Sequence, residues 1–130
     1  ALGVIDIDPF KQINDLHSHA AGDAALCAVA QALKACLRHH DLPARLGGDE
    51  FAFIAHETDA AGARDIGLRI AMYLQTLQIP KLPDPHGITL SIGIATAKPE
   101  DTRETMLARA DRALYDVKRQ GRNGVMVEAG

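Results

Sequence analysis

The residues Arg45-Leu46-Gly47-Gly48-Asp49-Glu50-Phe51 form a tight bend with an apolar run on each side. The run 42–46 before the bend and the run 51–55 after it are predicted to pair as the two arms of a hairpin. Gly47 and Gly48 supply the positive φ angles that such a bend requires. Glycines also leave backbone N–H groups bare, so that a phosphate group can approach them. Two acids at a hairpin tip repel one another and gain nothing for folding, so the bend predicts a functional site.

A second group of acids ends the first predicted strand, Gly3–Asp8. Asp6 and Asp8 are two residues apart and therefore point to the same face of that strand. With Asp49 and Glu50 they provide the hard oxygen ligands that Mg²⁺ prefers. A solvated strand end or a helix cap is the alternative interpretation of the strand acids. The sequence therefore favours a metal site only if the fold brings the strand and the bend together.

Composition limits the classes of function. The 130 residues, 47% hydrophobic and 24% charged, fit one globular domain. A net charge of −3 provides no basic surface for nucleic acid, and neither a membrane-spanning stretch nor a secretory signal is visible. Cys27 and Cys36 lie on opposite faces of one predicted helix, too far apart for a disulfide. We expect a cytoplasmic domain in a reducing compartment, whose parent protein is free to be anchored in a membrane.

Hydrophobic periodicity predicts the remaining elements. The expected order is β-α-α-β-β-α-β-α-β, an α+β domain of ferredoxin-like type with a mostly antiparallel central sheet and flanking helices, which we place on one side of the sheet. In this topology the first strand neighbours the hairpin, which would bring Asp6 next to the bend. After the first strand the predicted elements are a short helix from Pro9 to Asp15, a helix from about Asp23 to Leu37, the hairpin, a helix marked by Ala63 to Leu77, a loop containing Pro80, Pro83 and Pro85, a strand Ile88–Ile94, a helix marked by Leu107 to Val117 and closed near Gly121, and a strand Val125–Val127.

The chain resembles the GGDEF domain of diguanylate cyclases, a fold of the cyclase-palm type, over nearly all of its length. The resemblance implies a single GGDEF domain over residues 1–130. Because the chain opens directly in a strand, we expect a fragment that lacks an N-terminal helix and any regulatory domain. Ser18 replaces a glycine that the family commonly has before His19. The motifs that carry the resemblance are Asp6-Ile7-Asp8, Phe10-Lys11, Ile13-Asn14-Asp15, His19, Gly22-Asp23, the bend at 45–51, Ser91-Ile92-Gly93, Ala110 to Tyr115, Lys118 and Gly121-Arg122-Asn123.

The resemblance implies a catalytic site for GTP. Asp6, Asp49 and the carbonyl of Ile7 would hold Mg²⁺ or Mn²⁺. Glu50 would act as general base or charge partner for the attacking 3′-hydroxyl, a role that Asp49 could share. The substrate-binding residues would be Asn14 and Asp23 for guanine, Phe10 and Lys11 for the phosphates, Gly47 and Gly48 for base and sugar, His19, and Lys118 and Arg122 as a cationic clamp on the β- and γ-phosphates. Taken alone, Lys118 and Arg122 also suit the positive charge of a helix C-terminus.

A regulatory site is implied by Arg38-His39-His40-Asp41, which matches the Arg-x-x-Asp inhibition site of many family members. Arg38 would grip the phosphates or guanine edge of cyclic di-GMP, and Asp41 would accept from guanine. Arg69 is placed where a second arginine often completes this site across a dimer. A salt bridge at a helix C-terminus is the alternative for Arg38 and Asp41.

The resulting hypothesis is a diguanylate cyclase that joins two GTP molecules into cyclic di-GMP and releases two pyrophosphates. It would work as a homodimer in which each domain holds one GTP, with product inhibition at the Arg38 site. The alternative is a non-catalytic GTP- or cyclic di-GMP-binding regulatory module. Cyclisation within a single nucleotide is a third possibility that shares the fold and the metal chemistry.

Overall fold

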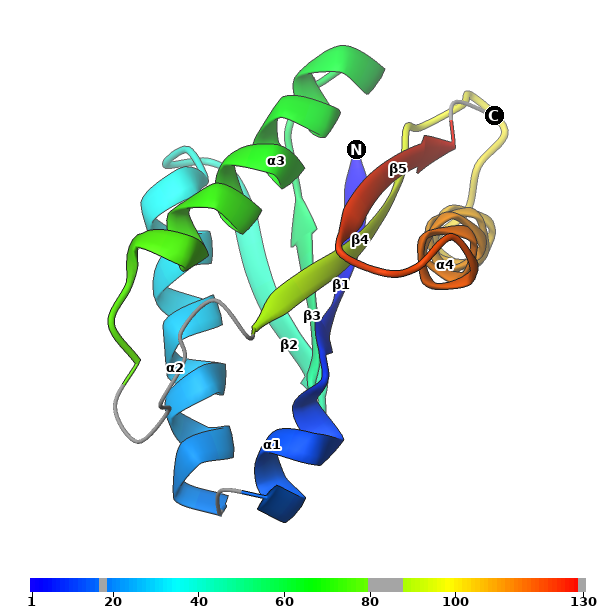
Figure 1. The fold of residues 1–130 in the computed structure, drawn as a ribbon. Helices are drawn as coiled ribbons and strands as arrows, with labels where there is room; N and C mark the ends of the chain where they lie inside the picture. Colours follow the sequence, from blue (N-terminus) through cyan, green and yellow to red (C-terminus); the bar gives the residue numbers. More distant parts are fainter. Residues whose placement is uncertain (17–18, 80–87, 129–130) are drawn as a thin grey trace.

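A computed structural model describes residues 1–16, 19–79 and 88–128, without the side chains at 14 and 16. Figure 1 shows one twisted sheet with helices on both sides. The observed order is the one expected from the sequence, although the second helix begins at His19 and not near Asp23. The predicted proline loop at 80–85 lies outside the described residues. The elements are β1 (Leu2–Asp8), α1 (Phe10–Leu16), α2 (His19–Cys36), β2 (Leu42–Gly47), β3 (Glu50–Ile54), α3 (Ala60–Thr76), β4 (Thr89–Ala95), α4 (Arg103–Arg119) and β5 (Gly124–Glu128).

The strand order in the sheet is β2-β3-β1-β4-β5. Strand β1 lies in the centre and pairs antiparallel with both β3 and β4, whereas β5 runs parallel to β4. Val4 and Ile5 of β1 point to opposite faces and both are fully buried, which explains the unbroken apolar run in this strand. In this register Asp6 lies opposite Glu50 on one side and Ser91 on the other. The expected adjacency of the first strand and the hairpin is therefore confirmed.

The main core lies between one face of the sheet and helices α2 and α3. Ile5, Phe53 and Ile92 project into it from three neighbouring strands and are fully buried or nearly so. On the helices the buried positions recur one turn apart, as with Ile66 and Ile70 of α3. The apolar stripe that predicted α3 thus covers the sheet, whereas the buried face of α2 is formed largely by small residues, among them Ala25, Ala28 and Ala32.

Helix α4 covers the opposite face of the sheet, so the expectation that the helices share one side was wrong. Its contact with the sheet consists mainly of small residues, and Val4, Ala110 and Leu114 belong to a second buried cluster there. Gly93 of β4 makes this close approach possible, because a Cβ at that position would lie 2.2 Å from the backbone nitrogen of Leu114 and 2.3 Å from the carbonyl oxygen of Ala110. The helix backbone rests directly on the strand at this point.

Both ends of α4 are defined by specific local interactions. Thr102 and Thr105 form a reciprocal capping box at the N-terminus. The other end is closed by Gly121, Arg122 and Asn123, all with positive φ, and the amide of Arg122 returns 2.9 Å to the carbonyl of Val117. This closure near Gly121 confirms the sequence prediction and places the last turn of α4 beside β1. No helix in the described part of the chain is both long and apolar enough to cross a membrane.

Candidate active site at the glycine bend

The acids of β1 and of the hairpin bend meet at one edge of the sheet. Asp6 is the register partner of Glu50, the first residue of β3. The amide of Ile7 donates to the carbonyl of Asp49 at 3.4 Å. The side chains of Asp6, Asp49 and Glu50 are all neither fully buried nor fully exposed. The spatial meeting on which the sequence-based hypothesis depended is therefore present in the structure.

The two glycines shape an open bend above these acids. Gly47 and Gly48 have φ angles of 143° and 53°, and the ladder between β2 and β3 shifts register just before Gly47. Arg45 locks the bend by donating to the carbonyl of Gly48 from Nε at 3.2 Å and from Nη2 at 2.7 Å. A Cβ on either glycine would meet no other atom within 4 Å. Two hydrogen bonds from Arg45 thus hold the bend, and the space next to both glycines is open to a ligand.

Crowding of negative charge is the main electrostatic feature of the site. Burial, together with the neighbouring carboxyl of Asp6, raises the pKa of Asp49 to about 6, against the opposing effect of Lys118. Lys118 of α4 reaches β1 and pairs with Oδ2 of Asp6. Oδ1 of Asp6 is buried and has no hydrogen-bond partner among the described residues. The single positive charge of Lys118 does not balance the two carboxyl groups of Asp6 and Asp49 when both are ionised.

A divalent cation fits this arrangement, because a buried carboxylate oxygen without a partner and a neighbouring carboxyl with a raised pKa are both satisfied by a bound cation. Asp6 and Asp49 would hold it with their side chains, and Ile7 would add a backbone carbonyl. In the described ranges no group of three or more His, Cys, Asp or Glu side chains is arranged to hold a metal. The ion would therefore depend on these few protein ligands and on ligands from a bound nucleotide.

Asp8 does not share in the acid cluster, although it points to the same face of β1. Its carboxylate accepts hydrogen bonds from Thr89 and Ser91 of β4 and from the backbone amide of Asn123. The structure gives no support for grouping Asp8 with Asp6 as strand ligands, because both oxygens of Asp8 already have protein donors. Ser91 belonged to a recognised motif, but its role as a donor to Asp8 was not predicted.

Two cations of the last turn and the turn that follows face the acids of β1. Lys118 contacts Asp6, and Nη1 of Arg122 lies 3.7 Å from Oδ1 of Asp8. The side chain of Arg122 is 55% exposed and remains accessible from solvent. Both cations point to carboxylates on another element. Stabilisation of the α4 C-terminus alone does not account for that placement.

The remaining predicted nucleotide residues lie on α1 and α2, which pack together directly after β1. Phe10 and Lys11 form the first turn of α1, and His19 opens α2 with an exposed side chain. Asp23 lies further along α2 and is also exposed. The side chain of Asn14 and all of Ser18 lie outside the described part. No hydrogen bond joins His19 or Asp23 to the acid cluster within the described ranges, so their roles remain predictions.

A second polar cluster surrounds Arg38 just after α2. Arg38 donates from Nε to Asp41 at 3.0 Å and from Nη2 at 3.2 Å, and it also reaches the carbonyl of His56 at 2.7 Å and the hydroxyl of Thr58 at 2.8 Å. Burial alone would raise the pKa of Asp41, but hydrogen bonds from Arg38 and from the amide of His56 outweigh it and hold this pKa well below its usual range. Asp41 is therefore a buried anion that orients Arg38.

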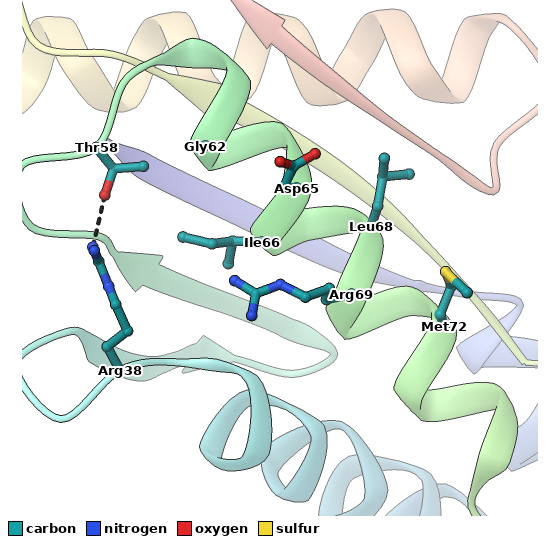
Figure 2. Close-up of a pocket in the computed structure, with 8 residues that line it drawn as sticks. All are labelled: Arg38, Thr58, Gly62, Asp65, Ile66, Leu68, Arg69 and Met72. Atoms are coloured by element: carbon teal, nitrogen blue, oxygen red, sulfur yellow. Dashed lines mark hydrogen bonds between the residues drawn. The ribbon is translucent and has the colours of Figure 1, made fainter.

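A cavity of about 410 Å³ lies between Arg38 and helix α3, and Figure 2 draws the residues that line it. Arg69 lies in this cavity on the same chain as Arg38, and Asp65 lies one helical turn before it. The side chain of Asp41 does not line the cavity. Asp65 was not predicted, although its helical spacing from Arg69 indicates that the two share a face. The complete lining is Arg38, Thr58, Gly62, Asp65, Ile66, Leu68, Arg69 and Met72.

Comparison with known proteins identifies the family. Residues 1–124 match the sequence model of a family described as "Diguanylate cyclase, GGDEF domain". The chain is 39% identical over 123 residues to diguanylate cyclase A of Treponema denticola, with 94% of this chain and 33% of that protein covered. It is 38% identical over 126 residues to diguanylate cyclase DgcM of Escherichia coli K12, with 97% and 30% covered. The chain therefore belongs to the GGDEF family of diguanylate cyclase domains.

A solved structure supports the same assignment of the fold. The coiled coil and GGDEF domain of DgcB from Caulobacter crescentus, solved in complex with c-di-GMP, has a TM-score of 0.90 and 33% sequence identity, with 98% of this chain and 68% of that chain covered. The present chain spans about a third of the length of the curated relatives described above.

Proposed function

We propose that this domain condenses two GTP molecules into cyclic di-GMP with release of two pyrophosphates, as one half of a homodimer. The observation that carries the proposal is the meeting of Asp6 with Asp49 at an open glycine bend, where one buried oxygen of Asp6 has no hydrogen-bond partner in the described part of the chain. A folding argument gives no reason for this concentration of negative charge. A site for a cation and a polyphosphate does.

The reaction would require three contributions from this chain. Asp6, Asp49 and the carbonyl of Ile7 would hold Mg²⁺ or Mn²⁺, which when bound neutralises charge on the phosphates. Glu50, next to Asp49 and opposite Asp6, would accept the proton of the attacking 3′-hydroxyl. The new bond joins this oxygen to the α-phosphorus of the second GTP, and the bond from that phosphorus to the β-phosphate oxygen breaks to release pyrophosphate.

Recognition of GTP would involve residues on both sides of the acids. Lys118 and Arg122 would clamp the β- and γ-phosphates, which their position at the end of α4 supports. The open backbone of Gly47 and Gly48 would receive the base and sugar. Guanine would be read by Asn14 and Asp23, while the amides of Phe10 and Lys11 would hold phosphate and His19 would complete the site.

Two domains facing each other would each present one GTP to the other, so that positioning supplies much of the rate enhancement.

The product would bind at the cavity of Figure 2, with Arg38 and Arg69 as the cations that contact its phosphates or guanine edges. The geometry favours a supporting role for Asp41, because both of its oxygens already accept protein hydrogen bonds.

The proposal is tested by incubating the protein with GTP and Mg²⁺ and separating the nucleotides by chromatography. Cyclic di-GMP and pyrophosphate are expected, with a specific activity that rises with protein concentration because two domains must meet. GTP binding without any product, from a protein shown to be dimeric, would favour the regulatory module. A product cyclised within one nucleotide would identify the third possibility, and a flat specific activity across a wide dilution series would contradict the homodimer.

A further inference from the structure

We infer that Asp8 is a positioning residue that holds the turn carrying Arg122 in place for the phosphates, and that it is not a metal ligand. The inference rests on the proposed function of the site at the glycine bend. It extends that function to a side chain for which neither the sequence motifs nor the geometry of the acid cluster provides a role.

Buried protein donors contact both oxygens of the Asp8 carboxylate. The residue is 5% exposed. Oδ2 accepts from the hydroxyl of Thr89 at 2.8 Å and from the amide of Asn123 at 3.1 Å, and Oδ1 accepts from the hydroxyl of Ser91 at 2.8 Å. A cation at this carboxylate would displace buried donors that have been matched to it. Asp6, by contrast, retains a buried oxygen with no hydrogen-bond partner among the residues that the structure describes.

The donors come from two different elements, which is why Asp8 links them. Thr89 and Ser91 belong to the start of β4, whereas Asn123 belongs to the turn between α4 and β5. Asp8 at the end of β1 therefore ties the edge of the sheet that carries the acid cluster to the turn that ends α4. The bond to Asn123 is the only one of the three contacts that reaches this turn.

The turn needs such an anchor because its backbone is strained. Arg122 and Asn123 are consecutive non-glycine residues with φ angles of 68° and 49°, a region that asparagine enters readily but that an arginine side chain disfavours. Residues persist in this region when surrounding contacts determine their conformation. One such contact is the bond from the Arg122 amide to the carbonyl of Val117 at 2.9 Å, and the other is the bond from Asn123 to Asp8.

The same anchor controls where Arg122 points. Its guanidinium lies 3.7 Å from Asp8, close enough for attraction but beyond hydrogen-bond distance, and its side chain is 55% exposed. Asp8 thus keeps the arginine at the site while leaving its N–H donors available to a phosphate. Loss of the Asp8 charge and of the Asn123 bond would release both the turn and the direction of the arginine.

The test compares nucleotides with and without the outer phosphates. The probe is 3′-deoxy-GTP with Mg²⁺, which lacks the attacking hydroxyl and cannot be turned over, and the reference is GMP. Asp8→Asn should weaken 3′-deoxy-GTP binding about tenfold, near the lower end of the cost of losing a hydrogen bond to a charged group, and leave GMP binding nearly unchanged. Arg122→Ala should have a similar effect, and the double variant should be no weaker than the weaker single variant.

The matched control is Asp111→Asn, which makes the same chemical change at an exposed position of α4 and should leave the ratio of the two affinities unchanged. Ser91→Ala is a milder variant in case Asp8→Asn does not fold, and it should shift the ratio in the same direction by less. The inference would be overturned if Asp8→Asn weakened the binding of both nucleotides equally, if its effect added to that of Arg122→Ala, or if it raised the Mg²⁺ concentration needed for 3′-deoxy-GTP binding. Failure of the unaltered protein to bind 3′-deoxy-GTP would instead overturn the proposed function itself.

Discussion

Replacement of Asp49 by asparagine should stabilise the metal-free domain while removing its function. The pKa of Asp49 is raised from its ordinary value of 3.8 to about 6 by burial and by Asp6, so the folded state disfavours the ionised carboxyl. As the pH rises from 3.8 through 6, the folded state therefore loses stability relative to the unfolded state. Asparagine keeps the size of the side chain and removes the titration.

The size of this effect follows from the pKa shift and the exposure of the group. Full conversion of the shift would correspond to about 3 kcal/mol of stability above pH 6. Asp49 is only half-buried, and solvent screening reduces the expected gain to about 1 kcal/mol. For a chain of 130 residues this gain corresponds to a rise in Tm of about 4 °C.

The assay is thermal unfolding of the unaltered protein and of Asp49→Asn in a metal chelator, at pH 4 and at pH 7.5. The variant should be more stable at pH 7.5, and the difference should nearly disappear at pH 4. Addition of Mg²⁺ at pH 7.5 should raise the Tm of the unaltered protein more than that of the variant. A variant that is less stable at both pH values would refute the view that Asp49 is held in an unfavourable charged state for the sake of a ligand.

Three further predictions concern the proposed general base, the contact of α4 with the sheet, and the proposed product site. Glu50→Gln should lower the rate of product formation about 10²–10⁴-fold while 3′-deoxy-GTP still binds; near-normal turnover would remove Glu50 as the base. Gly93→Ala should lower Tm by about 4 °C or more, because its Cβ would lie 2.2 Å from the backbone of α4, whereas Gly62→Ala, whose Cβ meets side-chain atoms no closer than 3.1 Å, serves as the control in the same unfolding assay. Arg38→Ala should weaken cyclic di-GMP binding about tenfold in calorimetry and leave 3′-deoxy-GTP binding unchanged, with the exposed Arg64→Ala as control; unaltered product affinity would refute the assignment of Arg38.

Much of this fold was predictable because its elements differ in periodicity. The alternating strands, the helical stripes and the glycine bend each have local signatures, and strand adjacency then brought Asp6 to Asp49 and Glu50. The face that α4 covers was not predictable in the same way. The apolar stripe of α4 shows only that it packs on something, and the decisive feature is that Gly93 lies beneath Ala110 and Leu114 in space.

The partners of individual polar side chains were the least predictable part of the site. A period of two correctly put Asp6 and Asp8 on one face, yet their environments differ because the donors to Asp8 come from residues far along the chain. Likewise the spacing of Asp65 and Arg69 shows that they share a face of α3, but not that the face looks onto Arg38. Local sequence determines the face of a helix or strand on which such a side chain lies, and tertiary packing determines which groups it contacts.

The central claim is that Asp6 and Asp49 bind one divalent cation together. Calorimetry tests it by measuring how the affinity for 3′-deoxy-GTP depends on Mg²⁺. In the unaltered protein the affinity should fall at least about tenfold when Mg²⁺ is replaced by a chelator, because charge-assisted contacts to the phosphates are lost. Asp6→Asn should bind weakly under both conditions. Equal affinity with and without Mg²⁺ in the unaltered protein, or an unchanged Mg²⁺ dependence in Asp6→Asn, would contradict the proposed site.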